Sequence, residues 1–340
     1  MKKMTPAIEY KKDKPTLTNT IKLHLAVIFI LLFIAMPHLP DYKTYQLIYE
    51  ERGGYLAIFG RDPGFVLLIN TFEPFISYNL FRQFTLALLA FITLLSIQNL
   101  QKSLPSKISN VFVLAITPYI LLKYGIQIRE GIALCLWLAI IMSADNRPKI
   151  LPFIAIALIS ISFHISSTPL WALLAIAFYF QPHFPRTASI ISISIFASYI
   201  FFVADVSRLE QDAFSGLNQK AITISIIQIL YWCIYICIFL AAALSNNIKT
   251  HKHTPMPNGI RSMQFITKSA MIGFAIGVFI QGINYGSELL QKGLISDLMR
   301  IAALLLFIYS TLLAAQRKNI MSLFISTFLM IDTLRIILSA

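Results

Sequence analysis

Charge and polarity are scarce in this chain, and their scarcity excludes a soluble protein. Only 13% of the 340 residues are charged, whereas 57% are hydrophobic, and the mean hydropathy is +0.72. Soluble domains typically contain about 45–50% apolar residues even when glycine is counted. Because apolar runs recur along the whole length, the sequence leaves no room for a second, soluble domain. We therefore expect one all-α, polytopic membrane domain over residues 1–340.

The motifs of several common enzyme classes are also missing. The sequence contains no phosphate-binding P-loop, no HExxH zinc motif, no GxSxG nucleophile turn and no paired-cysteine zinc pattern. ATP hydrolysis and zinc proteolysis therefore lack their usual sequence support, and we expect neither a metal nor a cofactor. The few cysteines, Cys135, Cys233 and Cys237, lie inside apolar runs without metal-ligand spacing to a histidine, which is typical of packing residues.

The apolar runs predict a bundle of about eleven transmembrane helices. A span needs roughly 17–25 apolar residues, and the predicted helices are 21–37, 79–98, 108–122, 127–144, 150–165, 167–180, 188–204, 221–244, 264–283, 296–314 and 320–338. The first run has no small-residue cleavage site, which indicates an uncleaved signal anchor. Residues 64–77 are too short to span, so we expect an interfacial or re-entrant helix there. "GFAIG", Gly273 to Gly277, has the small-residue spacing that lets two helices pack closely.

The distribution of basic residues predicts a cytoplasmic N-terminus. The net charge is +13, but the bases lie in short segments between apolar runs, which favours membrane topology over nucleic-acid binding. With a cytoplasmic basic tail at 1–20, the inner segments hold 17 of the 28 bases but only three of the 15 acids. This positive-inside pattern places the loops 38–78, 205–220 and 284–295 on the outer side.

The first outer loop combines acids with aromatic rings. "DYKTYQLIYEERGGYLAIFGRDPGF", residues 41–65, contains four acids and four tyrosines. Tyr42, Tyr45 and Tyr49 share one face if this segment is helical. Aromatic faces beside carboxylates suit sugar rings, although a belt of interfacial tyrosines would leave the same pattern. Proline and glycine in "RDPGF" predict a tight turn after Asp62.

Arginines recur where an outer loop meets a helix, at Arg82, Arg129, Arg300 and Arg335. Arginine at membrane depth is costly and usually has a partner, a water-filled cavity or an anionic ligand. Its guanidinium fork matches paired phosphate oxygens. Snorkelling to the interface is the alternative for Arg82 and Arg335. For Arg129 and Arg300, the alternative is an internal ion pair with the nearby acids Glu130 and Asp297.

A histidine completes the candidate site. His164 lies in "SISFHISSTPLW", at the predicted outer end of the fifth helix. A neutral imidazole there could accept a proton from a hydroxyl group or hold a phosphate by a hydrogen bond. A lone histidine that serves only as a structural donor is the alternative interpretation.

The order of these features resembles the EpsG family of exopolysaccharide and capsule membrane proteins, which belongs with the Wzy-like polysaccharide polymerases. "DYKTYQLIY", "RDPGF", "IREGIAL" and "SFHISS" are followed by an arginine that opens a late helix, and the likeness runs from about Met36 to Arg300. The resemblance implies a glycosyltransferase of the bacterial inner membrane. It would polymerise undecaprenyl-pyrophosphate-linked repeat units on the outer face, for an exopolysaccharide, capsule or O-antigen. Membrane lipid, a chain-length regulator and the flippase of the same pathway are the implied partners.

The resemblance also implies roles for individual residues. Asp41 and Tyr45 correspond to the family's aspartate and tyrosine loop, Asp62-Pro63-Gly64 to its acidic turn, and Arg129, His164 and Arg300 to its later motifs. The family usually has glutamate where this chain has Asp62, which puts a direct catalytic role for this shorter carboxylate in doubt. The implied catalytic residues are Arg129, His164 and Asp41. The implied substrate-binding residues are Tyr45, Asp62, Gly64, Arg300 and Arg82.

Several residues could serve as the catalytic base, and several activities fit the sequence. Spacing alone leaves Asp41, Asp62, Glu50, Glu51, Glu73 and His164 as candidates for the base. A flippase or transporter of lipid-linked glycans is the main alternative, but such a protein would be expected to place ionisable residues near mid-membrane or on both faces. A GT-C-type glycosyltransferase that uses a lipid-phosphate sugar would share the acidic first outer loop. A polytopic acyltransferase is a third alternative, but no cytoplasmic histidine has the neighbours expected of a catalytic histidine in that class.

Overall fold

Helices form every regular element of the described chain. The computed structural model describes residues 16–39, 41–52, 62–103, 117, 120–121, 123–143, 147–214, 234, 258–285, 294–315 and 319–338. The elements are α1 (Thr16–Ala35), η1 (Met36–His38), α2 (Tyr42–Glu50), α4 (Pro63–Phe72), α5 (Tyr78–Ser103), α7 (Ile128–Ser143), α8 (Ile150–Phe163), η2 (Ile165–Ser167), α9 (Thr168–Ala175), η3 (Ile176–Phe180), α10 (Pro185–Phe214), α12 (Asn258–Tyr285), α14 (Leu294–Ala315) and α15 (Asn319–Leu338). The all-α class is therefore confirmed for this part of the chain.

Most expected segments coincide with a helix. The two exceptions are 108–122 and 221–244, which lie outside the described residues apart from 117, 120, 121 and 234. Helix α10 continues to Phe214, past the expected helix end at 204 and into the expected outer loop 205–220, whose side of the membrane stays a prediction. Residues 205–214, "DVSRLEQDAF", contain good helix formers such as Arg208, Leu209 and Glu210. The segment has neither glycine nor proline, so nothing there ends the helix.

The length and composition of two helices suit a membrane span. Within the described residues, Tyr78–Gln98 of α5 and Arg261–Gln281 of α12 are long and apolar enough to cross a bilayer. A third span results if the bent pair Ala26–His38 and Tyr42–Glu50 is one broken helix. Shorter apolar helices cover Pro63–Phe72, Ile150–Phe163, Ile165–Phe180, Ile301–Ala314 and Ile320–Ile331. These helices are consistent with a membrane protein, and the expected number of eleven spans stays a prediction.

Apolar side chains cover the outside of several helices as well as the inside. On α1, Ile30, Leu31 and Ile34 are 57%, 57% and 68% exposed, and Phe279 on α12 is 70% exposed. Exposed apolar surface of this extent is unusual on soluble proteins and typical of surfaces that contact lipid or a partner. The exposed apolar side chains therefore agree with the membrane protein that the composition predicts.

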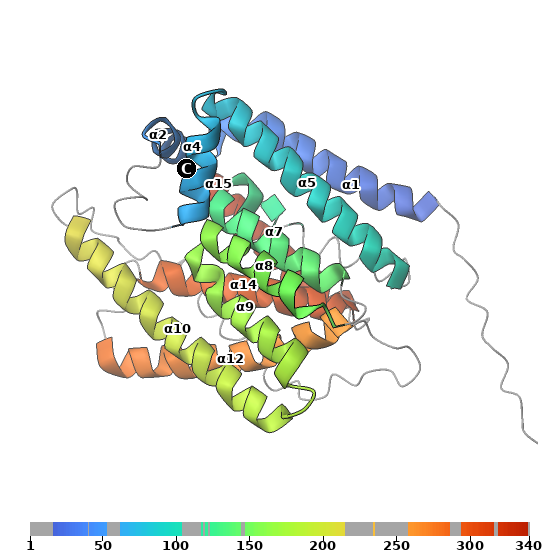
Figure 1. Ribbon diagram of the computed structural model, residues 1–340, viewed down its shortest axis with the longest axis vertical. Helices are drawn as coiled ribbons and strands as arrows, with labels where there is room; N and C mark the ends of the chain where they lie inside the picture. The colour runs from blue at the N-terminus through green and yellow to red at the C-terminus, as the bar shows by residue number, and fades with distance from the viewer. Residues whose placement is uncertain are drawn as a thin grey trace, which may run out of the picture.

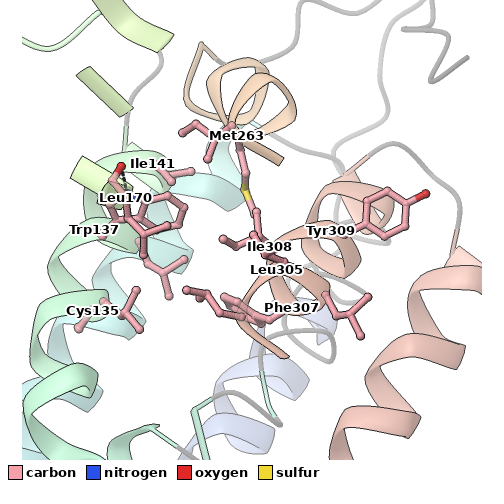
Figure 2. Packing of buried hydrophobic residues seen from close by; sticks show 14 of the residues in the cluster. Cys135, Trp137, Ile141, Leu170, Met263, Leu305, Phe307, Ile308 and Tyr309 are labelled. Carbon is pink, nitrogen blue, oxygen red and sulfur yellow. Dashed lines mark hydrogen bonds between the residues drawn. The ribbon is translucent and has the colours of Figure 1, made fainter. Parts of the chain in front are cut away.

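The main core lies between α7, α9, α12 and α14. Figure 2 shows Met263 of α12 reaching toward Ile308 of α14, while Trp137 of α7 lies beside Leu170 of α9. The indole Nε1 of Trp137 donates to the carbonyl oxygen of Leu170 at 3.2 Å. Cys135 is buried in the same core, as expected of a packing residue, whereas Cys233 and Cys237 lie outside the described residues.

Close packing of α10 on α12 depends on the two glycines of "GFAIG". A Cβ atom on Gly273 would lie 2.7 Å from the carbonyl oxygen of Ile193, and one on Gly277 would lie 2.7 Å from Cβ of Ile200. Both distances are too short for real atoms, so larger residues would push the helices apart. The prediction that these small residues let two helices approach is confirmed.

Candidate functional site

A second, aromatic core joins the segments that carry the candidate residues. It contains Tyr45, Tyr49, Phe65, Ile69, Tyr78, Phe81 and Ile128, which come from α2, α4, α5 and α7. In Figure 1, α2 and α4 lie together at one end of the bundle, next to the start of α5. This cluster brings residues 45, 62 and 129 to the same end of the molecule, although they are far apart in the sequence.

The tyrosine face of α2 packs inward. Tyr45 and Tyr49 are buried and Tyr42 is half-buried, as their spacing on one helical face predicts. The Tyr49 hydroxyl donates to the carbonyl oxygen of Ile76 at 2.8 Å. The ring of Tyr45 packs edge-on against Phe65, with 6.1 Å between the centroids. These buried rings offer no open stacking surface, so the expectation that Tyr45 and Tyr49 form a platform for sugars is not supported by their placement.

Asp62 lies at the centre of the polar contacts. It precedes Pro63 at the start of α4 and has a left-handed backbone with φ of 49°. Its carboxyl group is 3% exposed. Oδ2 accepts a hydrogen bond from Nη1 of Arg129 at 2.5 Å, and Oδ1 accepts one from the backbone amide of Ile165 at 3.0 Å. One carboxylate therefore connects the starts of α4, α7 and η2.

Arg129 pairs with the acid of a distant segment, not with its sequence neighbour. Besides the bond to Asp62, its Nε donates to the Tyr45 hydroxyl oxygen at 3.4 Å, and its guanidinium carbon lies 5.7 Å from the centroid of the Tyr45 ring. Glu130 instead pairs with Lys123, with 2.5 Å between Nζ and Oε2. The side chain of Arg129 remains 24% exposed, so part of its guanidinium can reach a ligand.

His164 faces the same carboxylate from the other side. It follows the last residue of α8, and its backbone amide donates to the carbonyl oxygen of Ser160 at 3.1 Å. Its Nδ1 lies 3.6 Å from Oδ2 of Asp62, which is too long for a hydrogen bond but close enough for a charge interaction. A carboxylate beside Nδ1 stabilises the imidazolium that forms when Nε2 takes a proton. His164 is 21% exposed, so it is accessible for such a transfer.

The electrostatics of the cluster keep Asp62 ionised. Burial raises the pKa of the Asp62 carboxyl, but the nearby imidazole of His164, the charge of Arg129 and the hydrogen bond from the Ile165 amide lower it. The lowering effects prevail, so the pKa of Asp62 lies below its ordinary value. A carboxylate with a lowered pKa and both oxygens bonded is a poor proton acceptor. Its position suits holding Arg129 and His164 in place.

The other acids of the first outer loop are not part of this cluster. Glu73 accepts a hydrogen bond from Nε of Arg52 at 2.9 Å, and Glu50 accepts one from Nε2 of Gln46 at 2.8 Å. Asp41 and Glu51 are exposed, and the structure shows no bond between the Asp41 carboxylate and another described residue. Of the six candidates for the base, only His164 combines exposure with a place beside Arg129 and Asp62.

The remaining substrate-binding candidates have different positions. Gly64 packs against the end of α8, because a Cβ atom there would lie 2.2 Å from Oγ of Ser162. Arg82 is 2% exposed, and its Nη2 donates to the carbonyl oxygen of Gly125 at 2.5 Å. Snorkelling does not describe this buried guanidinium. Arg300 and Arg335 lie on α14 and α15, but their side chains lie outside the described residues.

Two contacts were not predicted from the sequence. The Ile165 amide is a backbone group, so no residue type marks it. Lys123 is 1% exposed, and its Nζ also donates to Oε1 of Gln127 at 2.5 Å. The spacing of four residues between Lys123 and Gln127 could have suggested this pair. Across the residues that the structure describes, no group of three or more His, Cys, Asp or Glu side chains could hold a metal ion.

Comparisons of the chain with protein-family models, with curated proteins and with solved structures found no match. The function is therefore argued from the chemistry of the site.

Proposed function

We propose that the protein is a glycosyltransferase that polymerises undecaprenyl-pyrophosphate-linked oligosaccharide repeat units. In this proposal it spans the bacterial inner membrane about eleven times, with its N-terminus in the cytoplasm and its site at the outer face. The observation that carries the proposal is the contact of Arg129 and His164 with one carboxylate, Asp62, across three separate segments. Transfer from a pyrophosphate donor requires a cation that binds the pyrophosphate and a base that takes the proton of the attacking hydroxyl. Arg129 and His164, both partly exposed, can fill these two roles.

The proposed reaction uses these groups in the following way. The bond between the anomeric carbon of the donor sugar and the pyrophosphate oxygen breaks, and a new bond forms between that carbon and a hydroxyl oxygen of the acceptor. Arg129 stabilises the negative charge that develops on the leaving pyrophosphate. His164 takes the proton of the attacking hydroxyl at Nε2, while Asp62 beside Nδ1 stabilises the imidazolium. No nucleotide sugar is needed, because the pyrophosphate is already attached to the donor.

Asp62 is a positioning residue in this mechanism. Asp62 accepts from Nη1 of Arg129 at 2.5 Å, and the Tyr45 hydroxyl accepts from its Nε. The other N–H groups of the guanidinium are left for phosphate oxygens. The bond to the Ile165 amide holds the turn that follows His164. This arrangement accounts for a shorter aspartate at this position, because the carboxylate acts through its neighbours and does not have to reach the sugar.

The glycan profile of a deletion strain tests the proposal. We expect the deletion to leave lipid-linked or capped single repeats, and wild-type protein to restore long chains. Arg129→Ala should fail to restore them, since loss of one group that stabilises developing negative charge typically costs about 10²–10³ in rate. Arg52→Gln is the matched control, because Arg52 is an exposed arginine of the same loop whose ion pair with Glu73 lies outside the cluster. Both variants must first be shown to reach the membrane.

The same experiment separates the proposal from its alternatives. Single repeats that accumulate only on the cytoplasmic face would identify a translocator of lipid-linked glycans. Incomplete repeats that lack one sugar would identify a GT-C-type transferase. Either result, or long chains in the Arg129→Ala strain, would contradict the polymerase mechanism described above.

A further inference from the structure

Two buried donors at the start of α5 lack an acceptor. Tyr78 is the first residue of α5, and Arg82 follows one turn later on the same face. Their exposed fractions are 5% and 2%. The Tyr78 hydroxyl and the Nε of Arg82 are both buried, and neither has a hydrogen-bond partner among the residues that the structure describes. Buried polar groups are nearly always bonded, so a pair of unbonded donors one turn apart calls for an explanation.

The charge of Arg82 is also uncompensated. Its Nη2 donates to the carbonyl oxygen of Gly125, which supplies a dipole but no negative charge. Arg129 and Lys123, by contrast, each contact a carboxylate, with distances of 2.5 Å to Asp62 and 2.5 Å to Glu130. No carboxylate of the described residues pairs with Arg82. A buried cation without a counter-charge is strongly unfavourable, which indicates that an anion belongs beside it.

The surroundings of Arg82 favour an anion with several acceptor oxygens. The tyrosines that interact electrostatically with Arg82 are Tyr78, Tyr45 and Tyr42, and the ring of Tyr42 meets that of Tyr78 edge-on with 4.9 Å between centroids. Neutral phenol groups can donate hydrogen bonds to an anion, and they carry no negative charge that would balance the guanidinium. A phosphate group can accept from both a guanidinium and a phenol hydroxyl.

We propose that the Nε of Arg82 and the Tyr78 hydroxyl together bind a phosphate group. This site is distinct from the Asp62 cluster, in which Arg129 pairs with the Asp62 carboxylate. It does not rest on polymerisation and would stand if the protein moved glycans across the membrane. The phosphate can come from a lipid head group or from free inorganic phosphate, and the two sources share the chemistry that Arg82 and Tyr78 recognise.

Thermal unfolding of the full-length protein in an uncharged detergent tests this site. The two phosphate sources are inorganic phosphate and phosphatidic acid, with diacylglycerol of the same acyl chains as the lipid control that lacks phosphate. At least one source should raise the Tm of the wild type in a saturable manner, and diacylglycerol should not. Tyr78→Phe should weaken the apparent affinity about tenfold, the loss expected for one hydrogen bond to a charged group. Arg82→Met should abolish the response.

Controls keep each outcome decisive. Arg52→Gln removes an exposed arginine from the same side and should respond as the wild type does. Tyr78→Phe breaks no hydrogen bond seen in the structure, so it can decide the question even if Arg82→Met does not fold. Absence of a saturable response to both sources, an unchanged response in Tyr78→Phe, or an equal response to sodium chloride would overturn the proposal. A response to phosphatidic acid alone would assign the phosphate to a lipid head group.

Discussion

At the scale of single residues, the bonds of Asp62 divide the roles within the site. Both of its oxygens accept hydrogen bonds, one from Arg129 and one from the Ile165 amide. The carboxylate thus has little capacity left for a substrate proton. His164 is close enough to benefit from the negative charge and is exposed enough to receive a proton. A single carboxylate therefore holds together Arg129 and His164, which we propose as the anion-binding residue and the base.

The pH dependence of stability should report the ion pairs of Asp62. Because the pKa of Asp62 is lowered in the folded protein, its stabilisation is complete above the unfolded pKa of about 3.9. It is lost as the pH falls through the folded pKa. We expect Asp62→Asn to lower the free energy of unfolding at pH 7 by about 1.5–3 kcal/mol, the range for a hydrogen bond to a charged group.

Measurement of Tm between pH 7 and pH 3 checks this expectation. The difference between the wild type and Asp62→Asn should shrink as the pH falls through the acidic end of this range. An equal difference at both ends would show that the charge of Asp62 contributes nothing to stability. Glu50→Gln is a suitable control, because Glu50 is exposed and bonds only to Gln46 among the described residues.

At the scale of elements, the site depends on how closely α4 approaches α8. Gly64 allows this approach, because any side chain there would meet Ser162. We expect Gly64→Ala to displace the start of α4 and with it Asp62, two residues earlier. Chain elongation and Tm should both fall. Ser162→Gly in the same chain removes the two side-chain atoms nearest to the new Cβ, so the double variant should recover part of both losses.

The double variant separates packing from substrate contact at Gly64. Partial recovery in Gly64→Ala with Ser162→Gly would show that the glycine serves helix packing. If the double variant remained as inactive as Gly64→Ala while its Tm recovered, Gly64 would instead contact the substrate, as the family resemblance implies. The assay is in vivo chain length beside thermal unfolding of the purified variants.

At the scale of the whole molecule, the predicted topology places the end of the bundle that carries Asp62 on the outer side of the membrane. Glu51 lies at the end of the bundle that carries Asp62, whereas Phe184 lies in the turn between η3 and α10. Both residues are exposed. With the N-terminus in the cytoplasm, a membrane-impermeant maleimide should label Glu51→Cys in intact cells and label Phe184→Cys only after lysis. The native cysteines should first be replaced by alanine. Labelling of Phe184→Cys alone in intact cells would reverse the topology.

The sequence predicted the helices better than the roles of the polar residues. Apolar periodicity was sufficient for α5, α8 and α12, and the small-residue spacing was sufficient for the contact between α10 and α12. The pairing of Asp62 with Arg129 could not be predicted, because residues 67 positions apart meet only through tertiary packing. The nearer acid, Glu130, was the obvious partner from spacing alone, but it contacts Lys123.

Helix ends and buried charges were the other limits of sequence-based prediction. The polar composition of 205–214 indicated a loop, although the segment contains no residue that ends a helix. Snorkelling was the alternative interpretation of Arg82 at its helix start, yet this side chain is buried and interacts electrostatically with Tyr42 and Tyr45 of α2. Amphipathic patterns show which face of α2 points inward, but they do not show what that face covers.

The most direct test of the account is chain elongation by the purified protein in lipid vesicles. The substrate is a labelled lipid-linked repeat unit, and neither a nucleotide sugar nor ATP is added. Wild-type protein should convert single repeats into longer lipid-linked chains. His164→Ala should be slower by about 10²–10⁴, the usual contribution of a general base, at a temperature at which the variant remains folded. Elongation by His164→Ala at the wild-type rate, or movement of single repeats across the vesicle membrane without elongation by the wild type, would contradict the account.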